Sequence, residues 1–222
     1  IRDREGLQPE GGWEEIAGRV RGSIAQRFVL GDGKNYLSDC IHAEAGRSAA
    51  QGVPDDHLRP NQLFAVTVGA VDDPALAGEI VLACEELLVP GAIRSLADRP
   101  VSHALPYEWA GQVLNDPQRP YQGHYSGPED THRKPAYHNG TAWAWVFPSY
   151  AEALYLAFGE PAREAALAIA SSSAPMFESG CLGQLPEVLD GDAPHAQKGC
   201  SAQAWSASEL LRVLALLDHP SP

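Results

Sequence analysis

The sequence predicts an all-α protein of about six helices with long loops between them. Three observations predict this fold class. Apolar residues recur at steps of three and four in separate stretches, the alternation typical of half-buried strands is nearly absent, and the 21 glycines and 18 prolines concentrate in two long loops. Successive helix pairs can close into a ring of inner and outer helices, and an irregular helical bundle fits the same pattern equally well.

The first helix is expected over residues 13–28, because six apolar residues there form one stripe at helical spacing. They are Trp13, Ile16, Ala17, Val20, Ile24 and Phe28. The helix is expected to end before Gly31. Residues 28–41 are expected to form a small hairpin, since two short extended runs flank the letters GDGKN, whose glycines and asparagine tolerate the positive φ of a turn.

Two further helices are expected at residues 58–71 and 74–89, joined by the letters DDP. Pro74 suits the first turn of a helix, where its missing N–H leaves no intrahelical bond unmade. The two helices are therefore expected to form a helical hairpin.

Residues 95–140 lose the helical periodicity and are rich in Pro, Gly, His, Tyr and Asp. Ordered loops of this length are uncommon and are usually functional. Helical patterning returns in three later stretches, at residues 141–159, 161–177 and 201–217. Residues 178–200 form the second long loop, and Ser201 is expected to cap the last helix.

The charge balance argues against a nucleic-acid partner. The chain carries 16 Lys and Arg against 29 Asp and Glu, a formal net charge of −13. Binding a polyanion requires a clustered cationic surface that displaces counterions, and here the basic residues are scattered singly. A neutral or cationic partner is expected instead.

No stretch approaches the roughly 18 apolar residues that span a bilayer. The polar residues 1–12 do not resemble a secretory signal, so a cytoplasmic location without a membrane partner is expected. Cysteines 40, 84, 181 and 200 form no C-x-x-C pair and are expected to be reduced thiols. No cofactor and no metal are expected, because the chain lacks a phosphate-binding loop and any structural zinc spacing.

The loop at residues 114–145 combines aromatic side chains with polar ones, among them Tyr125. A sugar site requires this mixture, because pyranose rings stack their C–H faces on aromatic rings while their hydroxyls need donors and acceptors. The alternative is that Trp143 and Trp145 simply pack the start of a helix.

The loop at residues 181–205 places Glu187, Asp190, Asp192 and His195 close together in the sequence. Such groups are either solvated loop charges or a catalytic and binding set. Glu187 is the candidate acid or base, because it stands between apolar residues and partial burial gives a carboxyl group a useful pKa.

Five sequence blocks, in this order, resemble the C-terminal part of the amylo-α-1,6-glucosidase domain of glycogen debranching enzymes. They are LRPNQLFAV (58–66), VPGAIRSL (89–96), RPYQGHYSG (119–127), AYHNGTAWAW (136–145) and the long block 185–214 that begins LPEVLDGD. Residues 1–222 are accordingly assigned to one such domain part.

The resemblance implies an (α/α)6 toroid and an inverting glycoside hydrolase that removes the α-1,6-linked glucose left at glycogen or limit-dextrin branch points. It implies that Glu187 is the general base. The sugar-binding residues that it implies are Arg59, Asn61, Gln62, Tyr137, His138, Asn139, Thr141, Trp143, Trp145, Gln203 and Trp205. The loop patterns add Tyr125, Asp190, Asp192 and His195 to this set.

One departure concerns the general acid. The family carries it as an aspartate in a TWMD block upstream of RPNQ, and the 222 residues contain no such block. Inversion requires two carboxyl groups, so the chain is expected to be half of a toroid and a weak or inactive catalyst alone. The alternatives are a non-catalytic α-glucan-binding half-domain and a subunit completed by a separate N-terminal half. The open half-ring also predicts self-association through exposed apolar seams.

Overall fold

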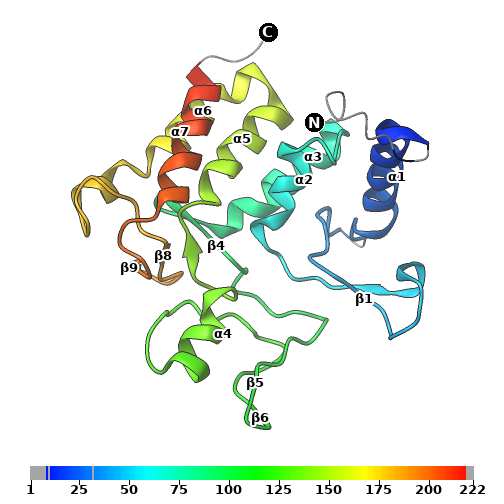
Figure 1. Cartoon of the computed structure of the whole chain (residues 1–222), viewed down its shortest axis with the longest axis horizontal. Coiled ribbons are helices and arrows are strands. Elements are labelled where there is room, and N and C mark those ends of the chain that lie inside the picture. The colour runs from blue at the N-terminus through cyan, green and yellow to red at the C-terminus, as the bar shows by residue number, and fades with distance from the viewer. Residues whose placement is uncertain (1–8, 10, 32, 219–222) are drawn as a thin grey trace.

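The computed structural model describes residues 9, 11–31 and 33–218. Most of the polar start, residues 1–8 and 10, lies outside the described residues, so the interpretation of that start is not addressed by the structure. Seven α-helices occur in the described part of the chain. Figure 1 shows α5, α6 and α7 together, with short strands below them and the irregular segment that carries α4 below those.

The N-terminal helix α1 (Gly12–Arg27) confirms the first predicted helix within one residue at each end. Its apolar stripe is only partly covered. No residue of α1 is fully buried, and Trp13 and Val20 remain exposed. Ile24 packs against the main core from the C-terminal end of the helix, so α1 docks mainly by that end.

The predicted hairpin at residues 28–41 is reduced to a single bridge between Val29 and Leu37. Its second run continues instead into β1 (Ile41–His42), which pairs antiparallel with β2 (Val53–Pro54). The turn itself forms, because the Leu30 amide donates to the Tyr36 carbonyl at 3.0 Å.

The predicted helical hairpin forms with shorter helices. A 3-10 turn (Pro60–Gln62) precedes α2 (Leu63–Thr67), which is followed by α3 (Pro74–Cys84). Asp73 caps α3 through a bond from the Ala75 amide at 2.9 Å, and Pro74 occupies the first turn as expected. The prediction of helix up to residue 89 was wrong at its end, because the chain leaves α3 through a 3-10 turn and enters a strand.

The near absence of strands was also wrong. Five strands of two or three residues form one antiparallel sheet in chain order: β3 (Leu88–Val89), β4 (Ala92–Arg94), β7 (Ala142–Trp143), β8 (Val188–Leu189) and β9 (Gln197–Lys198). Strands this short show no readable alternation, which is why the periodicity missed them. Within the ladder Trp143 pairs with Ile93 on one side and Val188 on the other.

The C-terminal helices are α5 (Phe147–Phe158), α6 (Arg163–Ser171) and α7 (Ala204–Asp218). The predicted helix at 141–159 begins six residues late because its first residues form β7. The last helix begins at Ala204, so Ser201 stands too early to cap it. Arg212 of α7 holds Glu152 of α5 with two bonds, at 3.0 and 2.5 Å, which fixes these two helices together.

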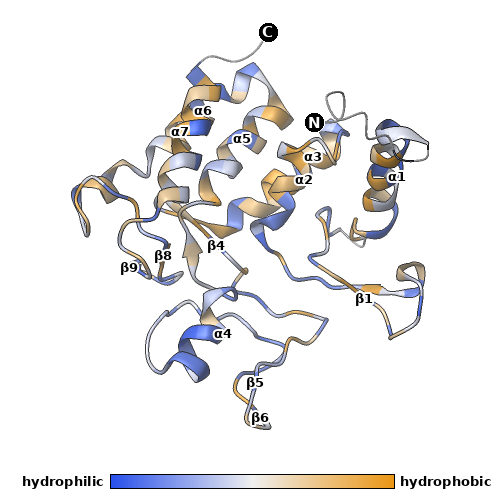
Figure 2. Ribbon diagram, in the orientation of Figure 1, coloured by the Kyte–Doolittle hydropathy of each residue, from blue (hydrophilic) through white to orange (hydrophobic). Residues whose placement is uncertain are grey.

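The long loop at residues 95–140 contains a two-stranded hairpin of β5 (Glu108–Trp109) and β6 (Gln112–Val113). It ends in a π-helical turn (Glu129–Arg133) that runs into α4 (Lys134–Tyr137). Figure 2 draws α4 largely in hydrophilic colour and α2 and α3 largely in hydrophobic colour. No helix in the described part of the chain combines the length and the apolar character that crossing a membrane requires. The arrangement of helix pairs as a ring stays a prediction.

Candidate functional site

A cavity of about 460 Å³ lies where the segment before α2, the end of β4, the end of α4, the start of α5 and the start of α7 meet. The residues that line it include the polar side chains Asp39, Arg59, Asn61 and Ser95 and the rings His138, Trp143, Trp145 and Trp205. A pocket of this size with convergent polar groups on aromatic walls is typical of a small-molecule site.

The ring wall is built by contacts between the rings themselves. Trp145 stacks on Trp205 with centroids 5.0 Å apart and on Phe64 at 5.6 Å. Trp143 stacks on His138 at 5.4 Å with an interplanar angle of 6°. Trp143 also packs edge-on against Trp205 with centroids 6.2 Å apart, so rings from α2, β7, α7 and the segment before α5 are joined. Trp205 is 43% exposed.

The Arg59 guanidinium ties the polar side of the cavity together. It donates to the carbonyls of Ser95 (3.1 Å) and His138 and to Asn139 Oδ1 (2.8 Å). Its Nε lies 3.1 Å from Asp39 Oδ2. Because these partners come from three segments far apart in the chain, Arg59 acts as a clamp for the cavity wall.

Asp39 is in turn positioned by a buried carboxylate. The Asp39 amide donates to Asp55 Oδ1 at 3.0 Å, and Asp55 is 1% exposed. His42 Nε2 lies 3.0 Å and His57 Nδ1 3.3 Å from Asp55 Oδ2. Burial alone would raise the pKa of Asp55, but the hydrogen bonds of His57 and His42 outweigh it and hold that pKa well below the ordinary value.

Glu187 lies within the second long loop and directly precedes β8. Its half-buried carboxylate is bonded on both oxygens. Oε1 accepts from the Tyr137 hydroxyl, and Oε2 accepts from the Cys200 amide at 2.8 Å. The carboxylate is therefore fixed by the protein rather than directed to bulk solvent.

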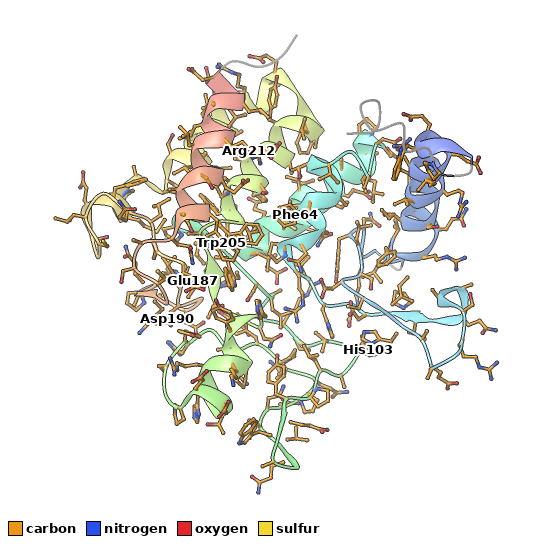
Figure 3. All side chains as sticks on the ribbon, viewed as in Figure 1. Phe64, His103, Glu187, Asp190, Trp205 and Arg212 are labelled. Carbon is orange, nitrogen blue, oxygen red and sulfur yellow. The ribbon has the colours of Figure 1, made fainter. Side chains whose placement is uncertain are left out.

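Glu187 is connected to the cavity through Tyr137. The Tyr137 ring packs edge-on against Trp143 and His138, with centroids 4.8 Å away in both cases. Those two rings line the cavity, Tyr137 contacts both of them, and Glu187 contacts Tyr137. In Figure 3 Glu187 lies between Trp205 and Asp190, and His103 lies on the other side of the view.

His138 presents its ring to the cavity in neutral form. Burial and the charge of Arg59 both lower the pKa of His138 below the ordinary value. At pH 7 the imidazole is therefore uncharged and can both donate and accept one hydrogen bond, which suits a neutral polyol better than a charged ligand.

Gly199 provides the space for the Glu187 carboxylate. A Cβ at this residue would stand 2.5 Å from Glu187 Oε2, and its φ of +67° disfavours other residues. Gly199→Ala is expected to displace the carboxylate and lower the melting temperature more than Gly183→Ala does. Gly183 is the matched control, because its φ is +74° and a Cβ there would meet nothing within 4 Å.

Thermal unfolding of both variants measures the melting temperatures. The NMR chemical shift of the Cys200 amide, measured separately, reports the position of the Glu187 carboxylate that this amide binds. Equal losses in the two variants, with an unchanged amide shift, would contradict the steric role of Gly199.

The family model described as amylo-alpha-1,6-glucosidase matches residues 3–212. The chain belongs to the amylo-α-1,6-glucosidase family. A comparison with curated proteins gave no match.

In this amylo-α-1,6-glucosidase family member, the structure gathers part of the predicted site around the cavity. The predicted residues that line it are Arg59, Asn61, His138, Trp143, Trp145 and Trp205. Tyr137 contacts two of these rings, and Tyr125 packs on Tyr137 with centroids 5.5 Å apart. Residues of the two distant loops therefore line one cavity.

Other predicted residues bind the backbone next to the site. Gln62 Oε1 accepts from the backbone amide of Leu37, and Gln62 Nε2 donates to the Arg59 carbonyl. The Thr141 hydroxyl donates to the Tyr137 carbonyl at 2.6 Å. Asn139 Nδ2 donates to the Pro135 carbonyl at 2.7 Å. Gln203 is half-buried just before α7, where its amide donates to the Leu185 carbonyl.

Asp190, Asp192 and His195 of the second long loop do not line this cavity. Asp190 accepts from the Tyr125 amide at 2.7 Å, and Asp192 accepts from the Tyr121 hydroxyl at 2.9 Å. His195 has a φ of +60° and lines a separate cavity of about 450 Å³. These three residues hold the loop that ends at β9.

Sequence reasoning missed Asp39, Ser95 and Asp55. No local pattern singles them out, because each acts on a segment distant in the chain. Among the described residues, one group has ligand atoms close enough to hold a metal, namely Asp39, Cys40 and Asp55 within 4.8 Å. Hydrogen bonds and ion pairs already occupy both carboxylates, so the donor set does not favour a metal.

Proposed function

We propose that this family member supplies the base side of an inverting α-1,6-glucosidase site, with Glu187 as general base and branched α-glucans as substrates. The observation that carries the proposal is the Glu187 carboxylate, which is held on both oxygens and is connected through Tyr137 to the rings that line a cavity of about 460 Å³. A base must point in one direction to activate a single water molecule, and this anchoring provides that.

In this mechanism Glu187 accepts a proton from a water molecule on the face of C1 opposite the departing sugar. The rings of the wall pack on the C–H faces of the glucose, and Asn61 with neutral His138 offers partners for its hydroxyls. An inverting pair of carboxyl groups stands about 6.5–9.5 Å apart, which leaves room for the water.

We further propose that the general acid comes from residues outside this chain, as expected of the C-terminal half of an (α/α)6 toroid. Within the described residues, Asp39 is the carboxylate that lines the cavity, and its bonds to Arg59 and Asn61 place it as a hydrogen-bond acceptor rather than a proton donor. Loss of general-acid assistance lowers rates by about 10²–10⁴, so the isolated chain turns over weakly.

Glucose release from a branched limit dextrin tests the base assignment. Glu187→Gln is expected to lower turnover by at least about 10²-fold, while Glu178→Gln, on an exposed 3-10 turn, leaves it unchanged. Turnover that survives in Glu187→Gln would refute the assignment.

The second candidate is a non-catalytic α-glucan-binding half-domain, favoured by the ring of Trp205, which lines the cavity and is 43% exposed. Titration with a branched oligosaccharide, followed by Trp fluorescence, separates the two functions. A binding module responds without releasing glucose, and its response is the same in Glu187→Gln.

A further inference from the structure

We infer that Tyr137 is a positioning residue, whose hydroxyl fixes the Glu187 carboxylate instead of binding a sugar hydroxyl. The catalytic consequence of this inference rests on the proposed function, whereas the contact between the two side chains does not. The resemblance implies only that Tyr137 belongs to the sugar pocket, so this role is a distinct one.

Glu187 is held through both its backbone and its side chain. Its own amide donates to the Cys200 carbonyl at 2.8 Å, and the Cys200 amide returns a bond to Oε2 at 2.8 Å. These two bonds fix one edge of the residue to the chain beside β9. The Tyr137 hydroxyl on Oε1 then removes the remaining rotation of the carboxylate plane.

Tyr137 is itself held rigidly enough to serve this purpose. It is the last residue of α4, and its carbonyl accepts from the Thr141 hydroxyl at 2.6 Å and from Trp143 Nε1 at 3.1 Å. The rings of His138 and Trp143 contact its ring edge-on. With its backbone and ring both fixed, the hydroxyl is directed at one acceptor.

A tyrosine suits this position because it does not exchange protons with its partner. Burial, the bond to Glu187 and the negative charge of Glu187 all raise the pKa of Tyr137. The hydroxyl therefore remains a donor throughout the neutral pH range, and the proton that arrives from water stays on the glutamate.

The Cys200 amide provides a test that needs no turnover, because it donates directly to Glu187 and its NMR chemical shift follows the charge of that carboxylate. Tyr137→Phe keeps the ring and removes only the hydroxyl. Its amide titration midpoint is expected about one pH unit above that of the wild type, since the charged carboxylate loses one donor. Tyr107→Phe is the matched control, because it also loses one bond, to the Pro120 carbonyl, and should leave the midpoint unchanged.

Glu187→Gln validates the reporter, since the pH dependence of the Cys200 amide should disappear in this variant. An unchanged midpoint in a folded Tyr137→Phe chain overturns the inference. Thermal unfolding checks that the two Phe variants are folded. We expect both to be folded, because each substitution keeps the aromatic ring and removes only the hydroxyl group.

Kinetics on the branched limit dextrin give the second readout. A positioning role predicts that Tyr137→Phe lowers kcat about 10-fold, leaves KM unchanged and moves the acid limb of the pH profile upward. A raised KM with an unchanged limb would show direct sugar binding and overturn the inference. If the amide midpoint shifts but Glu187→Gln retains turnover, the proposed function fails and the positioning contact stands.

Discussion

Replacing Asp55 by asparagine is expected to lower the free energy of unfolding by about 3–5 kcal/mol. Asp55 is 1% exposed and accepts bonds from the Ser38 hydroxyl and the Asp39 amide, while His42 and His57 face its second oxygen. An asparagine presents an NH₂ group to some of these donors, which leaves them buried without an acceptor.

Urea unfolding of Asp55→Asn measures the loss. Asp72→Asn is the control, because Asp72 is 72% exposed and pairs with Arg21 at 3.3 Å, an arrangement that contributes little to stability. Equal unfolding midpoints for the two variants would show that the buried carboxylate does not organise this part of the fold.

The same variant has a pH signature with a definite sign. Burial alone would lower the pKa of His57, but Asp55 and the His103 carbonyl raise it above the ordinary value. Stability from charged His57 is therefore complete below the unfolded pKa, about 6.5, and is lost as pH rises through the raised folded pKa. Stability from Asp55, whose folded pKa is lowered, is present above about 3.9 and is lost as pH falls further. Asp55→Asn should remove the alkaline decline.

Arg59→Met is expected to cost about 2–4 kcal/mol of stability and to abolish oligosaccharide binding in the cavity. The methionine fills much of the volume but provides none of the bonds to Ser95, His138 and Asn139, and it leaves Asp39 without its cation. The wall segments are then free to separate.

Arg59→Lys should recover only part of this loss, because an ammonium group lacks the planar fork that reaches several acceptors at once. Arg47→Met, at an exposed pair with Glu44, is the control for loss of an arginine. Urea unfolding and Trp fluorescence titration measure both effects. Wild-type binding by Arg59→Met would show that the clamp is not needed for the cavity.

The sequence predicted elements whose signals are local. The cap and first turn of α3, at Asp73 and Pro74, could be placed because a helix N-terminus has residue preferences that act within a few positions. The start of α5 could not, because Ala142 and Trp143 look helical by periodicity and become a strand only by pairing with β4 and β8.

The sequence likewise indicated some residues of the candidate site and could not indicate the contacts that hold it together. Residue types and the resemblance indicated Glu187 and the aromatic rings, and the structure brings them together. They could not indicate that Arg59 holds the wall, since its partners Asp39 and Ser95 are separated from it in the sequence and meet it only in the folded chain.

The five-stranded sheet fixes the position of Glu187 relative to the Trp143 ring. Trp143 and Val188, the neighbour of Glu187, are direct partners in the ladder, and a slip of one residue would turn one of the two to the opposite face. A design that moves this site to another scaffold must therefore include the paired strands β7 and β8. Loops grafted without these strands would not keep Glu187 and the Trp143 ring in their relative positions.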